Sequence, residues 1–427
     1  MATVSLPAPG GLAARGAPPF RLPGEHFAAA LGFLCVSAAM LVWAAPDIAR
    51  GLFPLPRVAA ATHLLTLGWI TTSIMGALYQ FLPVALGQPI RSLRLAHATF
   101  FLHVPGVALF VTGLVLNAPL PRTAGAALFG TALLLFVGNL AATLARAEKR
   151  DATWWALACA AASLTITVVL GITLALNLSR GFLGPARFLA LGVHIHVAAV
   201  GWVLLVMMGV GRHLLPMFLL SHGVGDGGNK LAVALVAAGV AWLVLFHHAP
   251  RVVFVPPAAL LVAAGVAAFL VQAARLYRHS VKPRLDPGMR LAAVALAFLA
   301  VALLLAPFAL WRGYADPRTA VAYVAALIPG ALTLFVAAHY YKIVPFLVWY
   351  HRFGPLAGKR PLPRVADLYD ERAASVAAGL LALGALGLVV ATLLGAPMAA
   401  RAATVAFAGG VAILTAQMIG VSRRKPV

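Results

Sequence analysis

The chain has 427 residues, of which 63% are hydrophobic and only 10% are charged. A soluble globular domain carries about 25% charged residues, so this composition excludes one and indicates helices that span a bilayer. The formal charge of +22 does not indicate nucleic-acid binding, because the basic residues lie in short loops between apolar runs. Cys35 and Cys159 fall inside apolar segments, which excludes a disulfide framework and a zinc cluster.

Twelve continuous apolar runs predict an all-α protein with twelve transmembrane helices in a single membrane domain over residues 26–427. The predicted helices span 27–46, 58–86, 93–117, 122–146, 152–177, 185–220, 229–249, 252–277, 290–312, 319–350, 373–395 and 400–421. Residues 1–25 are rich in Pro, Gly and Ala and lack the apolar core of a signal peptide, so we expect a flexible cytoplasmic tail.

Lys and Arg are distributed unevenly between the two sets of loops. Most of the 32 basic residues lie on the side that holds both ends of the chain. Cytoplasmic loops carry the excess of positive charge, so both termini are predicted to be cytoplasmic, in an inner membrane of bacterial type. The even-numbered helices then run from outside to inside.

A repeat occurs on the second and sixth predicted helices. His63, Gly68-Trp69, Met75-Gly76 and Pro83 recur 133 residues later; the matching residues are His196, Gly201-Trp202, Met208-Gly209 and Pro216. The tenth helix repeats only Gly330 and Pro345 of this pattern, with Ala325 at the histidine position. The pattern predicts three four-helix units, over about 26–150, 151–285 and 286–427.

Three histidines lie deeper in the apolar segments than most others: His63, His194 and His196. A buried imidazole in hydrocarbon costs a few kcal/mol unless it is hydrogen-bonded or ligated. A neighbouring Ser or carbonyl could satisfy one such ring, but no other ionisable partner lies on the same helices. His194 and His196 project about 200° apart on a helix, so they face different spaces and can serve two centres. His103 also lies within the membrane and has no assigned role, and His339 is interpreted as structural.

Other charged and metal-binding residue types give further expectations. His247-His248 ends the seventh helix, either as a polar pair at the interface or as copper ligands, since imidazole is a common copper ligand. Every Asp and Glu falls in a tail, a loop or a helix edge. Proton pumps and many proton-coupled carriers depend on carboxylates within the membrane, so neither mechanism is expected. No Cys-x-x-Cys-His motif occurs, so any haem is non-covalent.

Several segments resemble the catalytic subunit of the haem–copper oxidase and nitric oxide reductase superfamily, which has twelve helices in three arcs. The second helix, THLLTLGWITTSIMGALYQFLPVALG, is similar to the family helix that carries a low-spin haem ligand, and RLAHATFFLHVPG is similar to the helix that follows. HIHVAAVGWVLLVMMGVGRHLLPMF resembles the family's tenth helix, whose His-x-His binds two haems. The FHH that ends the seventh helix is similar to the paired copper histidines. The chain departs from the family pattern at two places. Ala198 stands where the sixth helix of the family has a tyrosine, and the tenth helix has no histidine near its outer end, where Tyr323 is the nearest polar ring. The layout is closer to that of NnrS-type haem- and copper-containing membrane proteins.

The resemblance implies one or two b-type haems, with His63 and His196 as axial ligands. His194 would bind a second haem or join His247 and His248 around copper. Basic residues near the outer face are expected to pair with haem propionates, because Arg binds carboxylates bidentately; these are Arg57, Arg180 and Arg187.

The expected function is redox or diatomic-gas chemistry related to respiration or nitric oxide handling, as in an oxidoreductase of haem–copper type. The partners would be lipid, a small gas or electron donor, and a further subunit for electron entry. The alternative is a transporter or a metal- or haem-handling permease that binds its substrate with the same histidines.

Overall fold

The computed structural model describes residues 18–313 and 315–426, so most of the predicted tail, residues 1–17, lies outside the described residues. The described part contains helices and no β-strand, and twelve of its helices are long and apolar enough to cross a membrane. The predicted all-α fold with twelve transmembrane helices is therefore confirmed. Nine spans are single helices: α2 (Arg21–Ala49), α5 (Leu93–Val115), α6 (Pro119–Leu144), α7 (Ala152–Arg180), α10 (Gly227–Phe246), α11 (Arg251–Arg278), α12 (Pro287–Arg312), α15 (Glu371–Leu394) and α16 (Pro397–Arg423).

The second, sixth and tenth spans each contain a π-helical segment. Their consecutive parts are α3 (Pro56–His63), η1 (Leu64–Thr71) and α4 (Thr72–Leu86); α8 (Ala186–His196), η2 (Val197–Leu204) and α9 (Leu205–Leu219); and α13 (Pro317–Ala325), η3 (Ala326–Leu332) and α14 (Thr333–Val348). The first two π segments begin 133 residues apart, as do the sequence motifs, and the third begins at the position that aligns Gly330 with Gly68. The three-unit repeat itself remains a prediction.

A glycine in each of these three spans packs against the preceding span. A Cβ on Gly68 would lie 2.7 Å from Phe33 on α2, one on Gly201 would lie 2.7 Å from Ser163 on α7, and one on Gly330 would meet Phe298 on α12. Only glycine allows the helices to approach this closely, as small residues do in membrane helix pairs.

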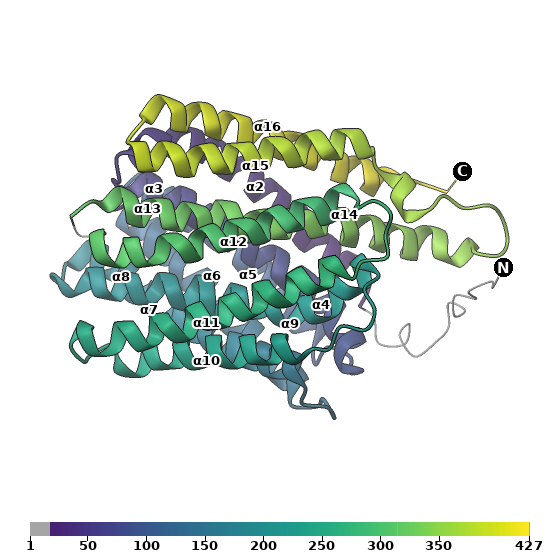
Figure 1. The fold of residues 1–427 in the computed structure, drawn as a ribbon, viewed down its shortest axis with the longest axis horizontal. Coiled ribbons are helices and arrows are strands. Elements are labelled where there is room, and N and C mark those ends of the chain that lie inside the picture. Colours follow the sequence, from purple (N-terminus) through teal and green to yellow (C-terminus); the bar gives the residue numbers. More distant parts are fainter. Residues whose placement is uncertain (1–17, 314, 427) are drawn as a thin grey trace.

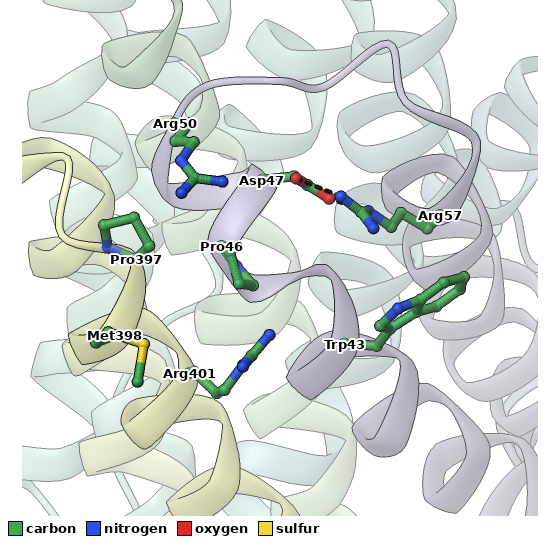
Figure 2. A pocket seen from close by; sticks show the side chains of 8 residues that line it. All are labelled: Trp43, Pro46, Asp47, Arg50, Arg57, Pro397, Met398 and Arg401. Atoms are coloured by element: carbon green, nitrogen blue, oxygen red, sulfur yellow. Dashed lines mark hydrogen bonds and ion pairs between the residues drawn. The ribbon is translucent and has the colours of Figure 1, made fainter.

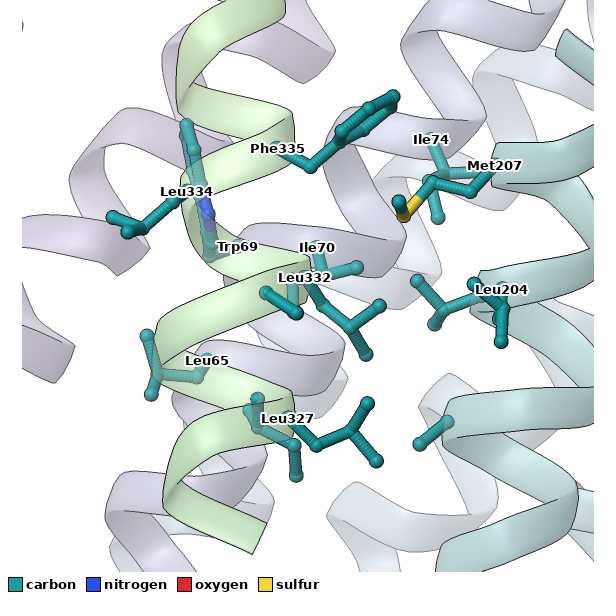
Figure 3. Packing of buried hydrophobic residues seen from close by; sticks show 14 of the residues in the cluster. Leu65, Trp69, Ile70, Ile74, Leu204, Met207, Leu327, Leu332, Leu334 and Phe335 are labelled. Carbon is teal, nitrogen blue, oxygen red and sulfur yellow. The ribbon is translucent and has the colours of Figure 1, made fainter. Parts of the chain in front are cut away.

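These three spans form the centre of the bundle. Between 56% and 78% of their most apolar stretches is buried, compared with 50% or less in the other nine spans described. Figure 3 shows Trp69, Met207 and Leu332, one from each span, in the same apolar layer. The spans are also joined by polar contacts, since Trp202 Nε1 donates to Thr71 Oγ1 at 3.2 Å. Side chains on the remaining helices, such as Leu260 and Leu304, are about 70% exposed, which suits contact with lipid.

The bundle has two ends. The terminal end holds the start of α2 and the end of α16, and the distal end, on the left in Figure 1, holds the starts of α3, α8 and α13. At the terminal end, Arg212 forms ion pairs with Asp151 and Asp226. Lys230 and Arg212 hold the pKa of Asp226 below its usual range, because both stabilise its charged form.

Candidate functional site

Four polar rings occupy the distal half of the central spans: His63 on α3, His194 and His196 on α8, and Tyr323 on α13. The side chains of all four residues are half-buried. Farther along the same spans the packing is complete, and Trp69 and Trp202, for example, are fully buried.

Local backbone contacts orient the His63 ring. Its Nδ1 lies 2.7 Å from the Ala59 carbonyl oxygen, which only accepts, so Nδ1 carries the proton and donates. The lone pair of the neutral ring is then on Nε2. The edge of Phe110 on α5 meets the ring at a centroid distance of 5.2 Å, and Phe110 contacts Phe129 on α6 at the same distance. His63 thus presents a free nitrogen beside an aromatic wall.

His194 on α8 lies near enough to His63 for the charged forms of the two rings to repel each other. On its other side His194 packs on α7, where a Cβ on Gly171 would lie 3.1 Å from His194 Cε1, so glycine provides the room for the imidazole. Nδ1 of His194 is buried, and the ring also meets the backbone of Thr167 on α7. We call His63 and His194 the first ring pair.

His196 faces a different neighbour. Its Nδ1 donates to the Gly192 carbonyl oxygen at 2.8 Å, and its Nε2 lies 3.4 Å from the Tyr323 hydroxyl, which can donate to it. The two rings are stacked, with centroids 5.9 Å apart and an angle of 18° between their planes. We call His196 and Tyr323 the second ring pair. The two pairs are related in sequence: His196 follows His63, and Tyr323 follows His194, by about the length of one repeat unit.

The other membrane histidines make structural contacts. His103 is buried, and its Nε2 lies 3.2 Å from the Leu67 carbonyl oxygen inside the π segment η1 and 3.1 Å from Thr72 Oγ1. The Leu67 carbonyl already accepts from the N–H and the hydroxyl of Thr72, so His103 is a further partner that joins α5 to η1. His339 is buried against the Phe335 ring, its Nδ1 donates to the Phe335 carbonyl oxygen at 2.8 Å, and its Nε2 is buried without a partner among the described residues.

The three arginines predicted to bind propionates lie in different surroundings. Arg57 forms a two-point ion pair with Asp47 on α2. Arg187 lies over the ring of Phe188, with 4.7 Å to its centroid, and Arg180 is exposed at the end of α7. Of the three, Arg57 thus has a carboxylate partner within the chain.

Arg122 on α6 is the residue that the sequence analysis missed. It is only 3% exposed, and it donates to Ser179 Oγ at 2.6 Å and weakly to Asn117 Oδ1 at 3.5 Å. Its Nε has no partner, and no carboxylate in the described ranges pairs with it. Arg122 precedes Phe129 by seven residues, so it lies on the same face of α6 and about 10 Å closer to the distal end. The only signal in the sequence is its place at the edge of a predicted helix.

The predicted copper ligands are not brought together. His247 and His248 are exposed at the end of α10, with ring centroids 5.8 Å apart. Across residues 18–313 and 315–426, no three side chains of His, Cys, Asp or Glu come close enough to hold a metal ion. The arrangement therefore does not assemble His194 with His247 and His248 as a three-ligand copper site.

Comparison with known proteins gives no relative from which a function could be transferred. No family model matches the chain, and no curated protein matches it. The relation to the haem–copper oxidase superfamily therefore remains a prediction from motifs, and the functional argument depends on the geometry of the ring pairs.

Proposed function

We propose that the chain is a membrane haem b protein with redox or diatomic-gas chemistry, and that the first ring pair, His63 and His194, holds the haem iron. The observation that carries the proposal is a half-buried imidazole, His63, whose Nδ1 is held by a backbone carbonyl and whose Nε2 is left to bind metal, with a second half-buried imidazole, His194, on a neighbouring central span. Imidazole is the commonest protein ligand of haem iron.

The surrounding residues fit the needs of a haem. Phe110 and Phe129 offer an apolar wall for a flat macrocycle. Haem also carries propionate carboxylates, and Arg122 is a buried guanidinium without a counter-ion, at a level nearer the distal end than the rings. An unpaired buried charge is strongly unfavourable, and bidentate pairing with a carboxylate relieves it. The histidine nitrogens, the aromatic wall and the buried guanidinium thus match the iron, the flat ring and the propionates of a single haem.

Each residue has a separate task in this proposal. A haem held by two histidines would supply one-electron transfer. The Ala59 carbonyl oxygen fixes the orientation of the His63 ring and makes its Nε2 a better ligand. Gly171 leaves room for the His194 ring, and Arg122 neutralises carboxylate charge.

The contacts favour His194 over His196 as the partner of His63. Nε2 of His196 lies 3.4 Å from the Tyr323 hydroxyl, whereas the His194 ring meets the backbone of Thr167 on α7 and no side-chain hydroxyl that a ligand would have to displace. We therefore assign His196 and Tyr323 to a second site, where Tyr323 holds a proton against His196. Binding of a second haem there would require that hydroxyl to be displaced.

A visible spectrum tests the proposal directly. Protein purified after expression with ample haem supply should show sharp b-type bands in the dithionite-reduced minus oxidised difference spectrum. His63→Ala and His194→Ala should each abolish the low-spin signal, whereas His196→Ala should retain it. His247→Ala serves as a control, because that ring is exposed and distant from the pair along the chain.

Two results would contradict this assignment. A colourless preparation would refute the haem and would favour a transporter that uses the same histidines. Loss of the low-spin signal in His196→Ala, with retention in His194→Ala, would instead restore His63 and His196 as the axial pair.

A further inference from the structure

We propose that a pocket at the distal end of α2 and α16 binds the phosphodiester of an anionic phospholipid. The pocket has a volume of about 460 Å³ and is lined by Trp43, Pro46, Asp47, Arg50, Arg57, Pro397, Met398 and Arg401. It is separate from the ring pairs, and the proposal does not depend on the haem. Figure 2 shows that its walls come from α2 and α3, which follow each other near the start of the chain, and from α16 near its end.

The pocket has an excess of positive charge. Three guanidiniums line it, and Asp47 is its single carboxylate. Arg57 binds both oxygens of Asp47, and that carboxylate is only 2% exposed, so it is already fully engaged. In the part of the chain that the structure describes, neither Arg50 nor Arg401 has an acceptor for its side chain, and both are exposed. Figure 2 shows Arg50 and Arg401 on either side of Pro46, apart from the ion pair. The two free guanidiniums therefore suit an anion with several oxygens.

Apolar stripes lead from the guanidiniums toward the middle of the bundle. On α2, Trp43 and Val36 lie seven and fourteen residues before Arg50, on the same face, and are 45% and 53% exposed. On α16, Val405 follows Arg401 by four residues and is 55% exposed. A free phosphate needs no such stripe, whereas a phospholipid places acyl chains beside apolar side chains and its phosphate at the helix ends. Trp43 suits this position, because tryptophan concentrates at the membrane interface.

Native mass spectrometry of the full-length protein, released from detergent, tests the site. We expect retention of phosphatidylglycerol over zwitterionic phosphatidylcholine. A basic residue near an anionic lipid surface contributes about 1 kcal/mol, so Arg50→Gln or Arg401→Gln should weaken binding about 5-fold and the double variant about 30-fold. Arg312→Gln is the matched control, because Arg312 is exposed at the same end but does not line the pocket.

A gain-of-binding variant guards against misfolding as the explanation. Asp47→Asn removes the pocket's carboxylate and frees Arg57, so it should strengthen phosphatidylglycerol binding about 5-fold, which a misfolded protein would not do. Inorganic phosphate is the competing probe, and we expect millimolar phosphate to leave the bound lipid in place.

Three results would overturn the proposal. The first is equal retention of the two lipids by the unaltered protein. The second is unchanged phosphatidylglycerol retention in the double variant. The third is displacement of the lipid by inorganic phosphate, which would identify the pocket as a site for the free anion.

Discussion

Replacement of Arg122 by glutamine should have opposite effects on the haem-depleted and the haem-bound protein. In the structure, the guanidinium is 3% exposed, has no carboxylate partner in the described ranges, and leaves Nε without an acceptor. Burial of an unsatisfied charged donor costs on the order of 1–3 kcal/mol or more, so Arg122→Gln should stabilise the haem-depleted protein by about that amount.

The haem-bound protein should lose affinity for its ligand. If a propionate pairs with Arg122, removal of the guanidinium leaves a buried carboxylate unpaired, which costs about 3 kcal/mol or more. This corresponds to haem binding that is at least about 100-fold weaker. The assay is the transfer of haem to excess apomyoglobin, followed by visible absorbance, together with thermal unfolding of the haem-depleted protein in the same detergent.

The exposed Arg180 at the same end of the bundle supplies the control. Arg180→Gln should change haem transfer by less than about 5-fold, since an exposed charge contributes at most about 1 kcal/mol. Unchanged haem retention in Arg122→Gln would refute the assignment of Arg122 to a ligand carboxylate. Destabilisation of the haem-depleted variant would refute the argument that the buried charge lacks a counter-ion.

Three further predictions concern packing, the second ring pair and pH. A Cβ on Gly125 of α6 would overlap backbone atoms of α5, so Gly125→Ala should lower stability in thermal unfolding by about 1–3 kcal/mol. Gly138 on the same helix has open space around it, so the control Gly138→Ala should be neutral or slightly stabilising. Equal melting temperatures for the two variants would contradict the close approach of the helices. Tyr323→Phe should cost about 0.5–1.5 kcal/mol of stability and leave the low-spin haem spectrum unchanged; a lost haem signal would instead place the tyrosine at the first pair. The pKa of Asp226 in the folded protein lies below the unfolded value of about 3.9. The ion pairs of Asp226 therefore stabilise the fold fully at a pH above about 3.9, and this stabilisation is lost as pH falls through the folded pKa. Melting temperatures measured from pH 6 to pH 3 should therefore fall less steeply for Arg212→Leu than for the unaltered protein, and parallel curves would show that the ion pair contributes nothing.

Hydropathy located the helices well, and it located their ends only where the apolar run and the helix end together. The eighth helix was predicted over 252–277 and spans Arg251–Arg278, because an uninterrupted apolar run determines both its length and its environment. The first was predicted to begin at residue 27 and begins at Arg21, since a helix continues through polar residues such as Glu25 once its backbone bonds are formed. Hydropathy indicates whether a segment is apolar enough for lipid, and it does not indicate how far the helix continues into polar residues.

The sequence by itself determined that the chain crosses a membrane twelve times and that unusual histidines lie within the apolar spans. It could do so because the insertion of a helix into hydrocarbon depends on its own residues. Only the tertiary structure decided that His196 lies beside Tyr323, and it alone revealed that Arg122 is buried and that Arg57 is paired with Asp47. These relations depend on the rotation and packing of helices far apart in sequence. A local sequence pattern does not predict these contacts, because membrane helices of similar composition are equally stable in lipid whichever way they are rotated.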